Sequence, residues 1–276
     1  MSRGPVVAVL SGGGAKAAAH IGAVRALLEA GIVPEHYVAT SLGAAVAAGF
    51  AAGLAPDALL ERLVHAGASG VARARLAPLG GLWLGSLMRA APLRRAMEQF
   101  LPVRRFGELQ VPLTVTATDL DTGERVLFGA GGEDVPIADA LMAACALPLF
   151  YPAVTLQGRR LADGGLRGVL PLDAVPAGAS RVVAVDIGPG FDELAEGPSP
   201  YPSLLRAHSD ATGILMADNT ALALALWRAT AGRPPLLVIR PRVERNATFR
   251  LDRARDYAED GYRAARAALM PGAGGT

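Results

Sequence analysis

A chain of 276 residues is long enough for one large domain, or two at most, and it can bury a core without disulfide support. Hydrophobic residues make up 51% of the chain and charged residues 19%, which is typical of a globular protein and excludes an intrinsically disordered one. The net charge of +2 argues against nucleic-acid binding, and the single cysteine, Cys145, which lies in an apolar run and is expected to be buried and unreactive, excludes an internal disulfide.

Two apolar runs resemble export or membrane segments but are too short. The run at residues 5–10 follows Arg3 and ends after six residues, which is less than an export signal needs. The Ala-rich run at residues 44–55 is too short to span a bilayer. We therefore expect a cytoplasmic protein that contacts a membrane, if at all, only peripherally.

The predicted elements alternate between strands and helices. Apolar or alternating runs predict strands at residues 5–10, 32–39, 111–118, 125–128, 154–156, 159–162, 181–187 and 236–239. Helical patterns lie at residues 15–30, 44–52, 56–65, 92–101, 137–147, 203–231 and 253–269. This alternation favours an α/β fold in three layers, α/β/α, with a mostly parallel central sheet. The Gly- and Pro-rich segment 188–202 indicates a surface loop, so we expect a single domain over residues 1–276.

Ser41 lies where a predicted strand meets a predicted helix. The segment 38–53 passes from strand residues through Thr-Ser-Leu-Gly into a run of small helix formers. Ala39 and Gly43, two positions before and after Ser41, are small enough to allow a very sharp turn. A helix that begins at this turn directs free N–H groups at the hydroxyl, which suits a catalytic nucleophile. The alternative is that Ser41 is only a helix N-cap.

The glycine-rich segment 12–17 also follows a strand and opens a helix, and three interpretations compete. A Walker A loop is excluded because Ala15 and Ala17 stand where it needs Gly and Ser or Thr. The dinucleotide pattern G-x-G-x-x-A is met, but the next strand ends in Ser41 and the nearest acid, Glu35, precedes that strand. The third interpretation is an oxyanion hole, since consecutive glycines expose backbone N–H groups beside a helix start.

A serine nucleophile needs a base. The histidines are His20, His36, His65 and His208. None follows a strand in a turn, where the histidine of a catalytic triad is expected, although His208 stays open. Asp163 ends a predicted strand and precedes Gly164 and Gly165, which let another part of the backbone come close. The alternative is an ordinary Asp-Gly turn, as predicted at Asp121.

These motifs resemble those of the patatin-like phospholipases. The family pattern G-G-G-x-[RK]-G is similar to residues 12–17, its G-x-S-x-G turn to residues 39–43, and its D-G-[GA] motif to residues 163–165. Further similar segments follow in family order at residues 19–22, 28–32, 118–124, 146–148, 152–154 and 258–262. Ala17 and Ala39 depart from the family pattern, since each replaces a glycine.

The resemblance implies acyl transfer without a metal or other cofactor. Ser41 would attack an ester carbonyl, and Asp163 would accept its proton directly. The glycine loop, Gly12, Gly13 and Gly14, would supply the oxyanion hole, and backbone N–H groups around Gly13 and Gly14 would hold the tetrahedral oxyanion. Lys16 would point toward this loop or toward a phosphate head group, and the alternative is an exposed side chain in the first helical turn. Gly164 and Gly165 would support the aspartate.

Several functions remain open on the same motifs. The first is a lipid acyl hydrolase of the phospholipase A or lysophospholipase type, acting on a phospholipid or another acyl-ester lipid. An acyltransferase or thioesterase would use the same residues, and a non-catalytic lipid-binding scaffold would keep the fold alone. A dinucleotide-binding oxidoreductase is the least supported function, because no acidic residue ends the second strand to hold the ribose.

The segment 66–107 is the candidate for a cap or for lipid access. It carries seven arginines and Trp83 but only one acidic residue, Glu98. Arginine, tryptophan and leucine together are typical of a segment that rests on a bilayer surface. The alternative is a solvated cap whose apolar residues pack on the core.

Overall fold

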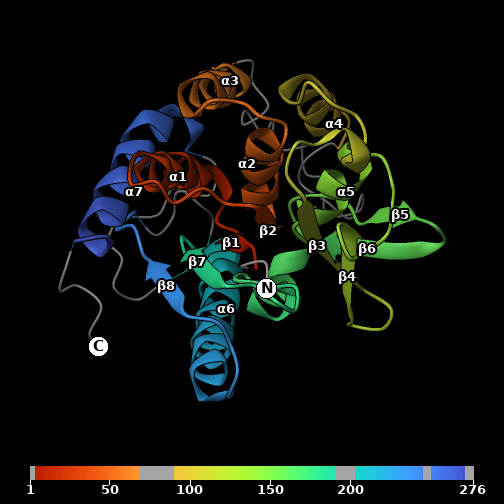
Figure 1. The fold of residues 1–276 in the computed structure, drawn as a ribbon. Coiled ribbons are helices and arrows are strands. Elements are labelled where there is room, and N and C mark those ends of the chain that lie inside the picture. The colour runs from red at the N-terminus through yellow and green to blue at the C-terminus, as the bar shows by residue number, and fades with distance from the viewer. Residues whose placement is uncertain (1–3, 69–89, 190–202, 245–249, 271–276) are drawn as a thin grey trace.

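The computed structural model describes residues 4–68, 90–189, 203–244 and 250–270 (Figure 1). Within these ranges an eight-stranded sheet has the order β5-β6-β3-β2-β1-β7-β8, and β4 pairs with β3. The strands are β1 (Val6–Leu10), β2 (His36–Thr40), β3 (Leu113–Asp119), β4 (Arg125–Gly129), β5 (Val154–Leu156), β6 (Arg159–Asp163), β7 (Arg181–Val185) and β8 (Leu236–Ile239). The α-helices are α1 (Ala18–Glu29), α2 (Leu42–Ala51), α3 (Pro56–Ala68), α4 (Ala90–Phe100), α5 (Ile137–Ala144), α6 (Ser203–Ala229) and α7 (Ala254–Ala268).

The sheet is parallel at its centre and antiparallel at one side. Strands β3, β2, β1, β7 and β8 run parallel, whereas β4, β5 and β6 pair antiparallel. Helices α1, α2, α5 and α7 cover one face of the sheet and α6 covers the other (Figure 1). The prediction of a three-layer α/β fold with a mostly parallel sheet is therefore confirmed.

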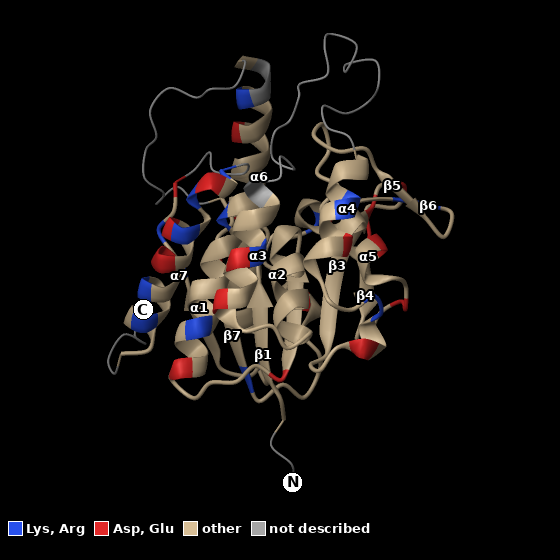
Figure 2. Ribbon diagram, turned by 90° about the horizontal axis from the view of Figure 1, so that it is seen from above, with Lys and Arg blue, Asp and Glu red and all other residues tan. Residues whose placement is uncertain are grey.

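The alternating side chains of β1 divide the core between the two faces. Ala8 and Leu10 belong to the cluster under α1, α2, α5 and α7, and Val7 and Val9 belong to the cluster under α6. This is why the strand has a continuous apolar run: both of its faces are buried. Figure 2 shows the consequence for charge, since charged residues gather on the outer helices and turns while the central strands are almost free of them.

Helices α1 and α7 pack with their backbones in contact. A Cβ on Gly22 of α1 would lie 1.7 Å from the carbonyl oxygen of Ala258, and a Cβ on Gly261 of α7 would lie 1.9 Å from the carbonyl oxygen of Ala19. Only glycine fits at either position. The closing helix 253–269 predicted from the sequence is therefore an integral layer of the fold.

Some predicted boundaries were wrong by several residues. The predicted helix 15–30 opens with a 3₁₀ turn, η1 (Gly14–Ala17), because Gly14 has a φ of +60° that no α-helix accepts. The second strand, predicted from residue 32, begins at His36. Gly31 at φ +73° and Pro34 hold the chain before it in a turn.

Parts of two predicted features lie outside the described residues. They are residues 69–89 of the arginine-rich segment 66–107 and residues 190–202 of the loop 188–202. Among the described helices, none has both the length and the apolar character needed to cross a bilayer.

Candidate active site

Strand β3 brings Ser41 and Asp163 together. Strand β4 pairs along one edge of β3, so β2 and β6 share its other edge. They approach from opposite directions: β2 ends with Thr40 opposite Thr116, and β6 ends with Asp163 opposite the next residue, Ala117. The two strand ends therefore meet, and the residues that leave them lie side by side at the carboxyl edge of the parallel strands, where α/β folds place their sites.

Ser41 sits at the tip of a strained turn between β2 and α2. Its φ of 54° and ψ of −138° are rare for a residue with a side chain and are those expected of a nucleophile held on a sharp strand-to-helix turn. The hydroxyl caps no N–H group of α2, so the N-cap alternative does not describe this side chain. Ala39 keeps a φ below zero inside β2, so its methyl group causes no backbone strain.

Gly43 has no room for a side chain. A Cβ there would lie 2.3 Å from the carbonyl oxygen of Ser11 and 3.1 Å from that of Leu10, the last residue of the neighbouring strand β1. The small residue two positions after Ser41 therefore lets α2 begin directly against β1. The nucleophile turn and the glycine loop are packed as one unit.

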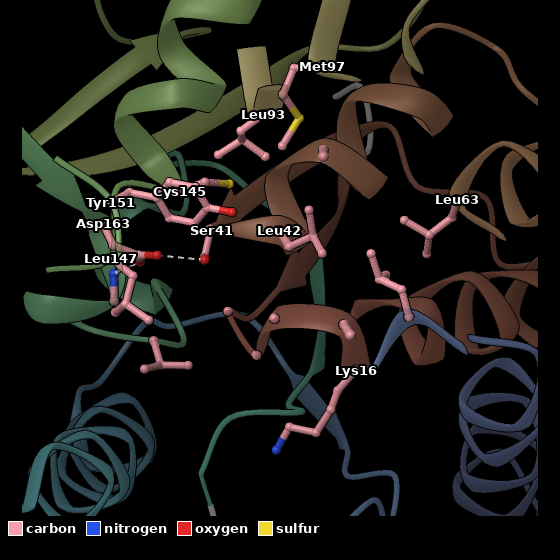
Figure 3. A pocket seen from close by; sticks show the side chains of 18 of the residues that line it. Lys16, Ser41, Leu42, Leu63, Leu93, Met97, Cys145, Leu147, Tyr151 and Asp163 are labelled. Carbon is pink, nitrogen blue, oxygen red and sulfur yellow. Dashed lines mark hydrogen bonds between the residues drawn. The ribbon is translucent and has the colours of Figure 1, made fainter. Parts of the chain in front are cut away.

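Both carboxylate oxygens of Asp163 accept hydrogen bonds. The Ser41 hydroxyl donates to Oδ2 at 2.6 Å, and the Gly165 N–H donates to Oδ1 at 2.8 Å (Figure 3). Burial raises the pKa of Asp163 to about 6, against the opposite effect of these two hydrogen bonds. The backbone is fixed as well, since the Thr118 hydroxyl donates to the Asp163 carbonyl oxygen at 3.0 Å. Gly164 has to be glycine, because a Cβ would lie 2.4 Å from the Thr116 carbonyl oxygen.

The three loop glycines are not equivalent. The N–H of Gly12 donates to the carbonyl oxygen of Val169 at 3.0 Å and is thus already used. Within the described part of the chain, the N–H groups of Gly13 and Gly14 meet no acceptor. Gly13 also packs tightly, since a Cβ on it would lie 2.8 Å from the Ile187 carbonyl oxygen. Gly14 at φ +60° turns the chain into η1.

Behind the loop, Ser11 and His20 hold the backbone in place. His20 is fully buried in α1 and donates from Nε2 to the Ser11 carbonyl oxygen at 2.8 Å. The Ser11 hydroxyl accepts the Ile187 N–H at 2.8 Å. Burial lowers the pKa of His20 to about 4, so its ring stays neutral. No pattern in the sequence indicated this role of Ser11.

None of the histidines, all of which lie in the described part of the chain, lines the cavity beside Ser41. His36 contacts the Thr114 hydroxyl at 2.9 Å inside the sheet, His65 is on α3, and His208 is exposed on α6. Asp121 lies in the turn between β3 and β4 and pairs with Arg160, as the ordinary-turn alternative describes. Of the acidic and histidine candidates, only Asp163 touches Ser41.

The cavity beside Ser41 has a volume of about 220 Å³ and is mostly apolar. Lys16 lines it but is only 3% exposed, so the exposed-side-chain alternative is wrong, and its side chain extends away from Ser41 (Figure 3). Cys145 is buried as expected, yet it also lines the cavity, with its thiol beside the Ser41 hydroxyl. Burial and the charge of Asp163 raise the pKa of this thiol, which makes it a poor nucleophile. The described residues contain no cluster of three or more metal-binding side chains.

Comparison with known proteins gives consistent results. A family model described as Patatin-like phospholipase matches residues 8–176. An uncharacterized NTE family protein of Mycobacterium tuberculosis is 32% identical over 189 residues, which cover 67% of this chain and 50% of the relative. Another from the same organism is 29% identical over 280 residues, covering 95% of this chain and 46% of the relative. This chain thus spans about half the length of these curated relatives. The crystal structure of VipD from Legionella pneumophila has a similar fold, with a TM-score of 0.51 at 14% identity over 97% of this chain and 67% of that one.

Proposed function

The chain belongs to the patatin-like phospholipase family, and from this premise we propose that it is a lipid acyl hydrolase that cleaves carboxylic esters through Ser41 and Asp163. The observation that carries the proposal is the 2.6 Å hydrogen bond from the Ser41 hydroxyl to the buried Asp163 carboxylate, at the edge of an apolar cavity. The substrate class is a phospholipid or another acyl-ester lipid.

In the first half-reaction Ser41 attacks the ester carbonyl carbon. Its proton passes to Asp163 Oδ2 along the existing hydrogen bond, and the carbonyl becomes a tetrahedral oxyanion. A free aspartate is a weak base for a hydroxyl, but a carboxylate with a pKa of about 6 is both ionised at neutral pH and a better proton acceptor. When the intermediate collapses, Asp163 returns the proton to the leaving alkoxide, and the acyl group stays on Ser41.

The oxyanion requires backbone donors, and we assign them to Gly13 and Gly14. Their N–H groups lie at the start of η1 and are unused within the described chain. Gly12 has a different part. A Cβ on Gly12 would lie 3.2 Å from the Ser41 Cβ, so the missing side chain keeps the nucleophile uncrowded.

In the second half-reaction water attacks the acyl-enzyme. Asp163 takes a proton from the water and gives it to the Ser41 oxygen as the tetrahedral intermediate collapses, which releases a carboxylic acid and restores the Ser41 hydroxyl. An alcohol or thiol acceptor in place of water would make the enzyme an acyltransferase, and a thioester substrate would make it a thioesterase. The formed hydrogen bond and the unused loop N–H groups favour an enzyme over a non-catalytic scaffold.

Contact with a membrane surface belongs to the same proposal. In the described part of the arginine-rich segment, Arg94 on α4 forms an ion pair with Asp139 at 2.7 Å, whereas Arg95 is exposed. Asp139 lies on α5, outside the segment 66–107, so a count of the charges within that segment does not include the partner of Arg94. Arg95 is therefore the better candidate of the two for an anionic head group.

The direct test is product analysis. Wild-type protein and the Ser41→Ala variant are incubated with a mixed phospholipid extract, and lipids are followed by mass spectrometry. Fatty acid and lysolipid should be released by the wild type only. An added alcohol acceptor separates hydrolase from transferase, because a transferase would form the new ester.

A further inference from the structure

The cavity beside Ser41 has two sides that differ in chemistry (Figure 3). Asp163, Leu147 and Tyr151 lie on one side of the serine, and Leu42 and Leu63 lie on the other. Leu93 and Met97 close the cavity from α4. A substrate bound at Ser41 must place its acyl chain on one of these sides and its alcohol on the other.

The proton transfer to the leaving group decides which side of the cavity takes the acyl chain and which takes the alcohol. The tetrahedral carbon carries four groups: the Ser41 oxygen, the oxyanion, the leaving oxygen and the acyl chain. The leaving oxygen has to come within hydrogen-bonding reach of Asp163, because that carboxyl group holds the proton it needs. The oxyanion points to the glycine loop. The chain is left with the direction away from Asp163.

We infer that the acyl chain enters the part of the cavity built by α2, α3 and α4, and that the alcohol leaves on the side of Asp163 and α6. This inference rests on the proposed function. We call this part the acyl arm, and its lining residues are Leu42, Ala45, Leu63, Leu93, Met97 and Phe100. The ligand it takes is an unbranched hydrocarbon chain.

The side chains of the described residues that line the acyl arm are hydrocarbon groups and one thioether. Leu63, Leu93, Met97 and Phe100 are each at most 8% exposed, so the side chains that a bound hydrocarbon chain would contact already lie largely out of water. Each buried methylene should strengthen binding by about fourfold. Met97 is unbranched and points from α4 into the cavity (Figure 3), which suits it to set the usable chain length.

Polar contacts connect the helices that form the walls of the acyl arm. Arg62 on α3 donates to the Phe100 carbonyl oxygen of α4 at 2.8 Å. On the other side of α4, Arg94 pairs with Asp139 of α5 at 2.7 Å. Helix α4 thus has a polar contact to each neighbouring helix, so we expect an enlarged side chain on it to shorten the arm more than it displaces the helix.

The opposite side is formed by different elements. Val169, Pro189 and Met216 line it, the last of them from α6. A Cβ on Gly165, beside Asp163, would lie 3.9 Å from the Met216 methyl group. Met216 therefore serves as the matched position for the alcohol side.

The test measures kcat/KM for p-nitrophenyl acetate, butyrate and octanoate. In Met97→Trp the ratio of octanoate to acetate should fall by about tenfold or more, since a filled arm removes several methylene contacts. Met97→Leu keeps a similar volume and should keep the wild-type ratio. Met216→Trp should leave the chain-length ratio alone and instead disfavour octanoyl lysophosphatidylcholine relative to methyl octanoate. Ala45→Leu fills the arm from α2 and replaces Met97→Trp if that variant does not fold.

The outcomes separate this inference from the proposed function. An equal loss on acetate and octanoate in Met97→Trp, or a chain-length effect in Met216→Trp, would overturn the assignment of the acyl arm while Ser41-dependent hydrolysis remained. A wild type that hydrolyses no ester would overturn the proposed function. In that case the acyl arm is tested alone by measuring how 1-octanol shifts the thermal unfolding temperature. Stabilisation of the wild type but not of Met97→Trp supports the acyl arm. Equal stabilisation of both proteins contradicts it.

Discussion

Ser41 and Asp163, 122 positions apart in the chain, are joined by a 2.6 Å hydrogen bond from the serine hydroxyl to the buried carboxylate. The bond exists because two strands end against consecutive residues of a third, Thr116 and Ala117 of β3. The partner of the serine is therefore set by strand register.

Ser41→Ala should reduce ester hydrolysis by several powers of ten, as for other serine nucleophiles that act as part of a unit. A serine-directed fluorophosphonate should label the folded wild type at Ser41 and neither the variant nor denatured protein. Ser209→Ala, on α6, is the matched control and should keep both labelling and rate. If the Ser41 variant retains more than about a tenth of the rate, another residue is the nucleophile.

The strain at Ser41 predicts a difference between two inactive variants. Alanine keeps the cost of a residue with a Cβ at φ 54°, whereas glycine accepts this conformation freely. Ser41→Gly should therefore be more stable than Ser41→Ala by about 1 kcal/mol or more in chemical unfolding. Equal stability would mean that the turn is relaxed.

Asp163→Asn should abolish activity almost as completely as Ser41→Ala, because the amide keeps the shape but accepts no proton. It should also stabilise the fold at neutral pH. Ionising the buried carboxyl group costs stability as the pH rises through its pKa of about 6, and the amide avoids this cost. The shift above an ordinary aspartate corresponds to at most about 3 kcal/mol. Thermal unfolding should show the gain at about pH 8 and its loss near about pH 4.

The pH dependence of hydrolysis should report the same carboxyl group. Only ionised Asp163 accepts a proton, so kcat/KM should rise with pH through about 6 and then level off. His20, with its pKa lowered to about 4, is neutral throughout that interval and adds no step to the profile. A rate that is constant between about pH 5 and 7 would contradict the role of Asp163 as the base.

Gly43→Ala and Ala39→Gly are a matched pair around the nucleophile. The first places a methyl group 2.3 Å from the Ser11 carbonyl oxygen and should disrupt the turn, with loss of activity and of stability. The second restores the family glycine but loosens β2, because Ala39 has no strain to relieve; it should cost about 0.5–1 kcal/mol and raise the rate little. A large gain in rate from Ala39→Gly would show that this methyl group limits the enzyme.

Membrane contact through the arginine-rich segment predicts binding to anionic vesicles that weakens with added salt. Reversing Arg95 to Glu should weaken it. Reversing Arg94 should act partly through the broken pair with Asp139, so its effect should be accompanied by a lower unfolding temperature. Equal binding to neutral and anionic vesicles would contradict membrane contact through the arginine-rich segment.

Local sequence patterns were enough to predict the strands, turns and helices that carry the site. A buried parallel strand needs an unbroken apolar run, a sharp turn needs small residues, and a helix needs its own periodicity. Each of these constraints acts within about ten residues, so the α/β layers and the turn at Ser41 could be predicted from the sequence. The family resemblance pointed to the N–H groups around Gly13 and Gly14, but a pattern of neighbouring residues could not show that the Gly12 N–H is bound to Val169.

The tertiary structure decided which of these groups meet. The register of β2 and β6 on β3 joins Ser41 to Asp163, and the approach of Val169 uses the Gly12 N–H and leaves those of Gly13 and Gly14. Likewise, burial among distant helices, not the residue type, raises the pKa of Asp163 to about 6. Hydrogen bonds and desolvation depend on atoms a few ångströms away in space, and those atoms come from segments that share no local pattern.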